Sequence, residues 1–68
     1  MTEFKLRAEY IELIQLLKAT GISGTGGQAK MMVEDGQVTL NGVQEFRKRA
    51  KLRVGDTVEI FDKKIRIV

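Results

Sequence analysis

Residues 25–53 read TGGQAKMMVEDGQVTLNGVQEFRKRAKLR, and this stretch sets the order of the central elements. Thr25 and Gln28 have the spacing of a capping box, in which the hydroxyl accepts from a first-turn amide and the second side chain reaches back. Gly36 is placed to end the helix, because glycine readily adopts the left-handed conformation. The stretch therefore predicts a helix from Gly26 to about Glu34 or Asp35, with Ala29, Met32 and Val33 on its apolar face.

A hairpin is expected to follow this helix. Residues 37–40 alternate between polar and apolar side chains, as a half-buried strand does. Asn41-Gly42 then provides two residues that tolerate positive φ, which a type I′ turn requires. Residues 43–45 would return antiparallel to the first strand.

A basic run follows the hairpin. Arg47, Lys48, Arg49, Lys51 and Arg53 fall within seven positions, and no acidic residue occurs between Phe46 and Gly55. Phe46, Ala50 and Leu52 would anchor this segment to the core. Such a density of cations favours a polyanionic partner, because each neutralised phosphate releases counterions. A solvated surface loop is the alternative.

The flanks supply a strand–helix unit and a second hairpin. Residues 3–7 alternate as a strand, and residues 9–19 carry an apolar stripe of Tyr10, Leu13, Ile14 and Leu17 at helical spacing. Gly21 would end this first helix. Residues 57–61 and 64–68 are expected to form the last hairpin, with a turn at Asp62-Lys63.

Composition limits the possible functions. The 68 residues form one domain, residues 1–68, with 43% hydrophobic and 31% charged side chains and a net charge of +3. The chain has no cysteine and no histidine, so disulfides and thiolate or imidazole metal sites are excluded. We expect no catalytic residues, no cofactor and no small-molecule substrate. Without a membrane span or a secretory segment, we expect a cytoplasmic monomer.

The glycines before the second helix form a possible anion site. The P-loop pattern is absent, but Gly26 and Gly27 leave bare amides at a helix N-terminus, where a phosphate can approach closely. Lys30 would lie one helical turn further on. The alternative is a flexible connection between two helices.

These residues resemble the alpha-L RNA-binding domain named after ribosomal protein S-four, also found in tyrosyl-tRNA synthetases and RNA pseudouridine synthases. The similarity runs from Leu13 to Ile60 and rests on Thr25-Gly-Gly-Gln-Ala-Lys30, Leu40-Asn41-Gly42 and Lys51-Leu-Arg-Val-Gly-Asp56. The length is similar to that of short stand-alone bacterial members. The arginine that commonly follows the helix cap is Gly26 here, a departure that removes one phosphate contact.

The resemblance implies an α+β fold, with two packed helices on a small, strongly bent antiparallel sheet of four to five short strands. It also implies that structured RNA, ribosomal or tRNA-like, binds across the second helix and the neighbouring hairpin, with ribosome-associated proteins as further partners. The residues expected to contact RNA are Thr25, Gly26, Gly27, Gln28, Lys30, Arg47, Lys48, Arg49, Lys51 and Arg53.

Two other functions remain open. An adaptor that docks on an acidic protein would use the same cations. A sulfur-carrier-like β-grasp protein shares the hairpin and the late Gly-Asp, but such carriers are modified at a terminal Gly-Gly, whereas this chain ends Ile65-Arg66-Ile67-Val68.

Overall fold

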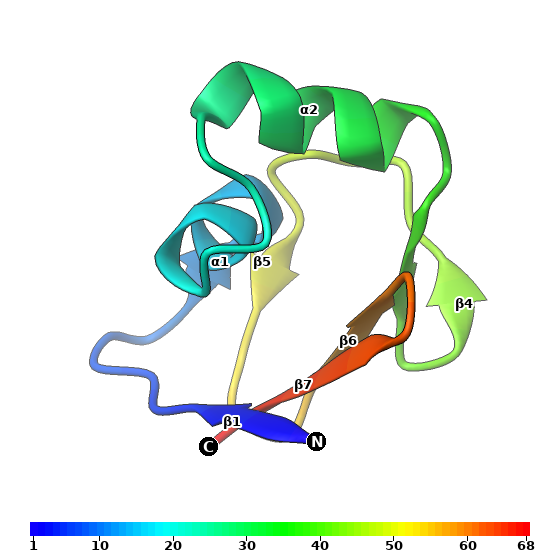
Figure 1. The fold of residues 1–68 in the computed structure, drawn as a ribbon. Coiled ribbons are helices and arrows are strands. Elements are labelled where there is room, and N and C mark those ends of the chain that lie inside the picture. The colour runs from blue at the N-terminus through cyan, green and yellow to red at the C-terminus, as the bar shows by residue number, and fades with distance from the viewer.

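The computed structural model describes residues 1–68 and has an α+β architecture (Figure 1). Two helices cover a five-stranded sheet, and a two-stranded ribbon lies beside the first helix. In chain order the elements are β1 (Thr2–Phe4), β2 (Ile11–Glu12), α1 (Leu13–Ala19), α2 (Gly26–Glu34), β3 (Val38–Leu40), β4 (Val43–Gln44), β5 (Lys51–Leu52), β6 (Thr57–Ile60) and β7 (Lys63–Ile67).

The larger sheet has the strand order β1-β7-β6-β3-β4. Its neighbours are antiparallel except β1 and β7, which run parallel with Thr2 opposite Ile65. The sheet is therefore mixed, and not wholly antiparallel as the sequence suggests. A parallel pair needs a long crossover, and nearly the whole chain lies between these two strands, which also places both termini at this edge (Figure 1).

The core lies between the helices and the sheet. α1 contributes Leu13, Leu16 and Leu17, and α2 contributes Ala29 and Val33, all fully buried. Leu16 was not part of the predicted apolar stripe. The remaining buried apolar residues come from the strands and the segment before β5: Val38, Ala50, Leu52, Val58, Ile60, Ile65 and Ile67.

The predicted start of the first helix is wrong. α1 begins at Leu13 instead of Glu9, because Ile11 and Glu12 pair with β5. Tyr10 therefore precedes the helix and is 38% exposed, whereas the apolar stripe placed it in the core. A long-range strand pairing overrides the local helical period here.

Three smaller expectations also need correction. β1 ends at Phe4, short of the predicted Arg7, although Leu6 still packs against the core. Phe46, expected to anchor the basic run, is 56% exposed. The last turn falls one residue early, at Phe61-Asp62, where Phe61 has a φ of +56°.

The predicted turns and caps are present. Gly36 has a φ of +76°, and the Asn41-Gly42 turn has φ values of +53° and +83°. The Thr25 hydroxyl accepts a hydrogen bond from the Gln28 amide at 3.1 Å. The Gln28 side chain reaches back one residue further than a capping box predicts, because its Oε1 accepts from the amide of Gly24 at 2.8 Å.

Candidate nucleic-acid interface

The ribbon of β2 and β5 arranges the basic run. Glu12 lies opposite Lys51 and Ile11 opposite Leu52. Because side chains alternate across a strand, the buried Leu52 points inward and its neighbours Lys51 and Arg53 point outward. Tyr10, two residues before Glu12, lies on the same outward face, and its ring contacts both cations.

This alternation extends through the whole basic run. Arg47, Arg49, Lys51 and Arg53 are exposed and line an open hollow of about 490 Å³, whose only other lining residue is the buried Ala50. We call these four residues the odd-numbered cations. Lys48 is half-buried and does not line the hollow. The structure thus brings together four of the five predicted cations and separates the fifth.

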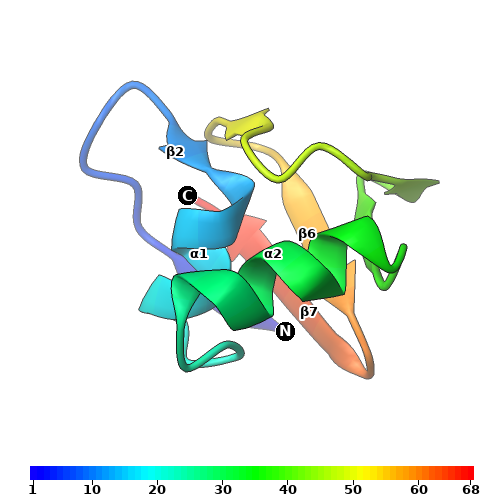
Figure 2. The same ribbon diagram turned by 90° about the horizontal axis from the view of Figure 1, so that it is seen from above.

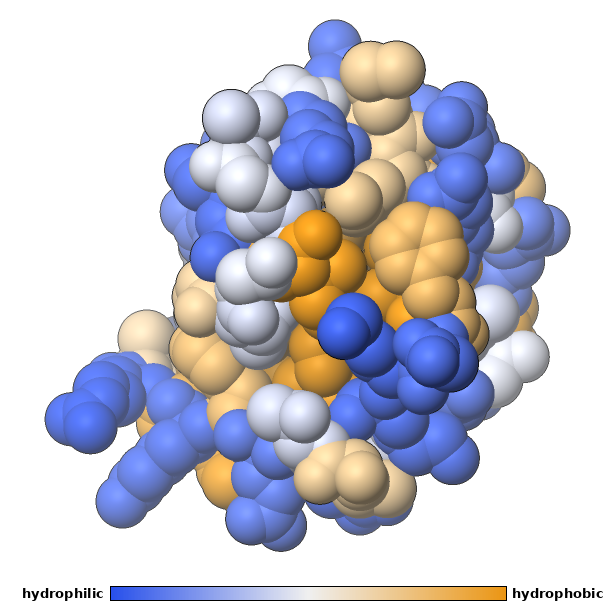
Figure 3. All heavy atoms as spheres, viewed as in Figure 1, coloured by the Kyte–Doolittle hydropathy of each residue, from blue (hydrophilic) through white to orange (hydrophobic).

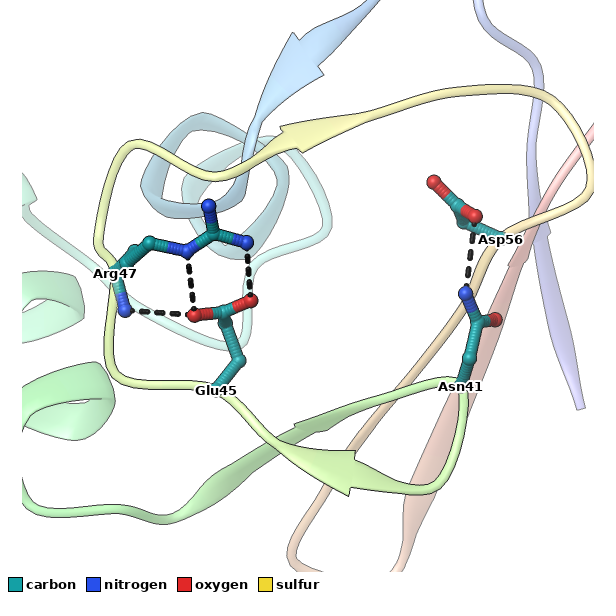
Figure 4. Close-up of polar contacts among 4 residues, drawn as sticks. All are labelled: Asn41, Glu45, Arg47 and Asp56. Atoms are coloured by element: carbon teal, nitrogen blue, oxygen red, sulfur yellow. Dashed lines mark hydrogen bonds and ion pairs between the residues drawn. The ribbon is translucent and has the colours of Figure 1, made fainter.

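Two of the odd-numbered cations are paired with carboxylates, one from a nearby residue and one from the start of α1. The Arg47 guanidinium donates Nε and Nη2 to the two oxygens of Glu45, each at 3.0 Å, and the Arg47 amide donates to the same carboxylate (Figure 4). The Arg49 Nε donates to Glu12 at 3.2 Å. Lys51 and Arg53 have no carboxylate partner, so they are the odd-numbered cations most available to an anion.

The hydrogen bonds from Arg47 hold the pKa of Glu45 below its ordinary value of 4.5. The folded state thus binds this proton less readily than the unfolded state does. The stabilisation from the pair is complete above pH 4.5 and is lost as the pH falls through the lowered pKa. At neutral pH the pair is intact and partly neutralises Arg47.

The backbone of the basic run also caps α1. The amides of Leu13 and Ile14 donate to the carbonyls of Ala50 and Lys48, at 2.9 and 3.1 Å. Two N-terminal amides of the helix, which lack partners within it, are satisfied in this way. The basic run is therefore held against the N-terminal end of α1 by backbone contacts that do not depend on its side chains.

A second group of candidate residues lies at the N-terminus of α2. Thr25, Gly27, Gln28 and Lys30 are exposed there. A Cβ built on Gly26 would lie 3.9 Å from Cδ and 4.0 Å from Nζ of Lys18, in the last turn of α1. The Lys18 ammonium thus lies close to the position that a side chain at residue 26 would occupy. The sequence analysis missed Lys18 because only the packing of α1 on α2 brings it to Gly26.

The two groups lie at opposite ends of α1. The basic run contacts the N-terminal end of α1, and Gly26 lies beside Lys18 in its last turn. Figure 2 shows this separation, with the segment before β5 running past α2 toward the start of α1. The candidate surface is therefore extended, since α1 spans about 10 Å at 1.5 Å per residue.

The hairpin turn fixes the far end of the basic run. The Asn41 side chain donates to Asp56 at 3.0 Å (Figure 4) and accepts from the Thr57 amide at 2.8 Å. The other carboxylate oxygen of Asp56 accepts from the Arg53 amide at 2.8 Å. Asn41 thus does more than form the turn, because it ties β3 to the residues that follow Arg53.

The face seen in Figure 3 differs from the basic surface. Apolar side chains gather at its centre, and hydrophilic side chains lie mainly toward its rim (Figure 3). The basic run lies on the far side in this view, as Figure 2 shows. No cluster of three potential metal ligands occurs in the chain, and no helix is long and apolar enough to span a membrane.

Comparisons with known proteins agree with this fold. The family model described as "S4 domain" matches residues 4–68. YbcJ of Escherichia coli K12 is 39% identical over 69 residues, covering all of this chain and 99% of YbcJ. The "Probable ribosome maturation protein RlbA" of Bacillus subtilis is 40% identical over 52 residues, covering 76% of this chain and 73% of RlbA.

A solved structure supports the same assignment. The solution structure of E. coli YbcJ, described as revealing an alpha-L motif involved in RNA binding, matches with a TM-score of 0.77 and 39% identity. The alignment covers all of this chain and 87% of the chain in that solution structure. Sequence, family model and structure agree over nearly the full length, and the chain belongs to the S4 domain family.

Proposed function

We propose that the chain binds structured RNA, ribosomal or tRNA-like, through phosphate and shape contacts, as a single domain and without catalysing a reaction. The observation that carries this proposal is the hollow lined by the four odd-numbered cations, two of which, Lys51 and Arg53, have no carboxylate partner. Double-helical RNA is recognised mostly through its backbone and shape. The description of YbcJ as carrying an RNA-binding motif and the name of RlbA as a ribosome maturation protein support an RNA partner.

The N-terminus of α2 supplies a second phosphate contact in this proposal. Lys18 and the amides of Gly26 and Gly27 present positive charge at the same point, since a helix N-terminus carries a partial positive charge. Lys18 would supply a cation close to Gly26, where the family resemblance leads one to expect an arginine. Lys30 lies one turn further along α2. A bound RNA would extend from the N-terminus of α2 to the odd-numbered cations.

The salt dependence of binding tests the proposal. We expect log K for a structured ribosomal RNA fragment to fall against log salt with a slope of roughly −3 to −4, as about four phosphate contacts require. Fluorescence anisotropy at several salt concentrations measures the slope, and a DNA duplex of the same length should bind more weakly. A slope near zero, or equal weak binding to both nucleic acids, contradicts the proposal and favours an acidic protein partner.

Glu45→Gln is expected to increase RNA affinity roughly 3- to 10-fold at about 0.1 M salt, because Arg47 no longer has to give up a carboxylate to bind its phosphate and because a negative charge is removed. The salt slope should change by less than about 0.9, because no phosphate contact is added. Glu59→Gln is the matched control, since Glu59 lies on β6 and pairs with Lys64 at 3.8 Å. Equal effects of the two substitutions would show that only net charge matters and that Arg47 makes no contact.

A further inference from the structure

Tyr10 occupies a position that core packing does not explain. It precedes α1 and is 38% exposed. The Lys51 Nζ lies 4.9 Å and the Arg53 Cζ 5.8 Å from the centroid of its ring. These are distances at which a cation is attracted to an aromatic face. The two odd-numbered cations without carboxylate partners are therefore both gathered at one exposed aromatic ring.

Tyr10 also lines a second hollow, of about 380 Å³, which is separate from that of the odd-numbered cations. The loop between β1 and β2 forms most of its wall, with Leu6, Ala8 and Ile11 among the apolar lining. Lys5 and Arg7 line the same hollow, and no carboxylate does. The Tyr10 ring thus stands between a mostly apolar hollow and two cations.

We propose that this hollow, which we call the Tyr10 hollow, accepts one unpaired nucleobase of the bound RNA. The inference rests on the proposed RNA binding and adds a site that phosphate and shape contacts do not require. Unpaired bases are recognised by stacking on aromatic side chains, and every base offers an apolar face for this. Lys51 and Arg53 would hold the phosphates that flank the base, and the apolar lining would cover its ring.

The positive charge around the Tyr10 hollow favours a nucleobase over an apolar protein side chain as its occupant. Lys5 and Arg7 line the hollow, and Lys51 and Arg53 lie over the Tyr10 ring. A hydrophobic protein segment would leave these cations without partners, and burying unpaired charge is costly. A nucleotide satisfies both features at once, because its base is apolar on its faces and its phosphate is anionic.

The experiment compares two RNA hairpins that differ only in a single bulged 2-aminopurine, at a salt concentration where both bind. We expect the protein to bind the bulged hairpin about 10-fold more tightly than the fully paired one, a typical gain from stacking one base. The fluorescence of 2-aminopurine should change on binding, because its stacking partners change. Tyr10→Phe should retain both effects, since it keeps the ring.

Two variants should remove the preference. Tyr10→Ala deletes the stacking surface, and Ala8→Ile fills the hollow with a non-aromatic side chain from an exposed position outside the core. Ala8→Ile should bind the paired hairpin as the unchanged protein does, and circular dichroism should show that both variants fold. Equal affinity of the unchanged protein for the two hairpins, or a preference that survives both variants, overturns the nucleobase site alone. Failure to bind either hairpin overturns the site and the proposed RNA binding together.

Discussion

Replacing Arg47, Lys51 and Arg53 together with glutamine should lower the affinity for structured RNA on the order of 100-fold at about 0.1 M salt. The three side chains line the same hollow, and each is expected to neutralise a phosphate. The salt slope should become shallower by about 2.7, at about 0.9 for each lost contact. Arg49 is left unchanged because it pairs with Glu12, the N-cap residue of α1.

The matched control for this variant replaces Lys63, Lys64 and Arg66 with glutamine. These residues are exposed on β7, away from the basic run, and their loss changes the net charge by the same amount. Fluorescence anisotropy across a salt series compares the two triple variants. If both lose affinity equally, general attraction between a basic protein and RNA explains the binding, and the hollow has no special role.

Gly36→Ala should destabilise the fold by about 1.5–3.5 kcal/mol. A side chain at this φ of +76° costs about 1–2 kcal/mol. The new Cβ would also collide with the Gln44 side-chain amide, which donates a hydrogen bond to the Gly36 carbonyl, and press on the Phe46 ring. Losing that bond adds about 0.5–1.5 kcal/mol. A domain of this length has a total stability of only about 3–10 kcal/mol.

Urea denaturation followed by circular dichroism measures this loss. Gly27→Ala is the control, because Gly27 lies in α2, has no positive φ, and a Cβ there would meet nothing within 4 Å. Alanine in a helix reduces the entropy of the unfolded chain, so this variant should be as stable as the unchanged protein or more so. A Gly36→Ala variant of unchanged stability would mean that Gln44 and Phe46 do not hold the hairpin against the end of α2.

The elements that the sequence predicts well depend on residues close together in the chain. Thr25 caps α2 through an amide three residues away, and Asn41-Gly42 forms its turn within one hairpin. Such signals act over a few bonds and can be recognised without tertiary structure. The order of helices and strands, and the cations of the basic run, therefore follow from local patterns.

The predictions that were wrong concern residues with distant partners. Tyr10 shares the apolar period of α1, but the pairing of Ile11 with Leu52 stops the helix short of it. Phe46 looks like a core anchor, yet it stays exposed next to Gly36, where only the closing of the β3–β4 hairpin places it. Neither outcome can be read from spacing, because each depends on residues that the local pattern does not include.

Local signals in the sequence are enough to predict a capped helix, a tight hairpin and a dense basic run. Which of the cations in that run lack a carboxylate partner depends on how the chain packs. Glu12 and Arg49 are 37 residues apart, and Lys18 reaches Gly26 only through the packing of α1 on α2. Local structure follows from backbone preferences over a few residues, whereas the charge available to a partner depends on every side chain that folding brings near it.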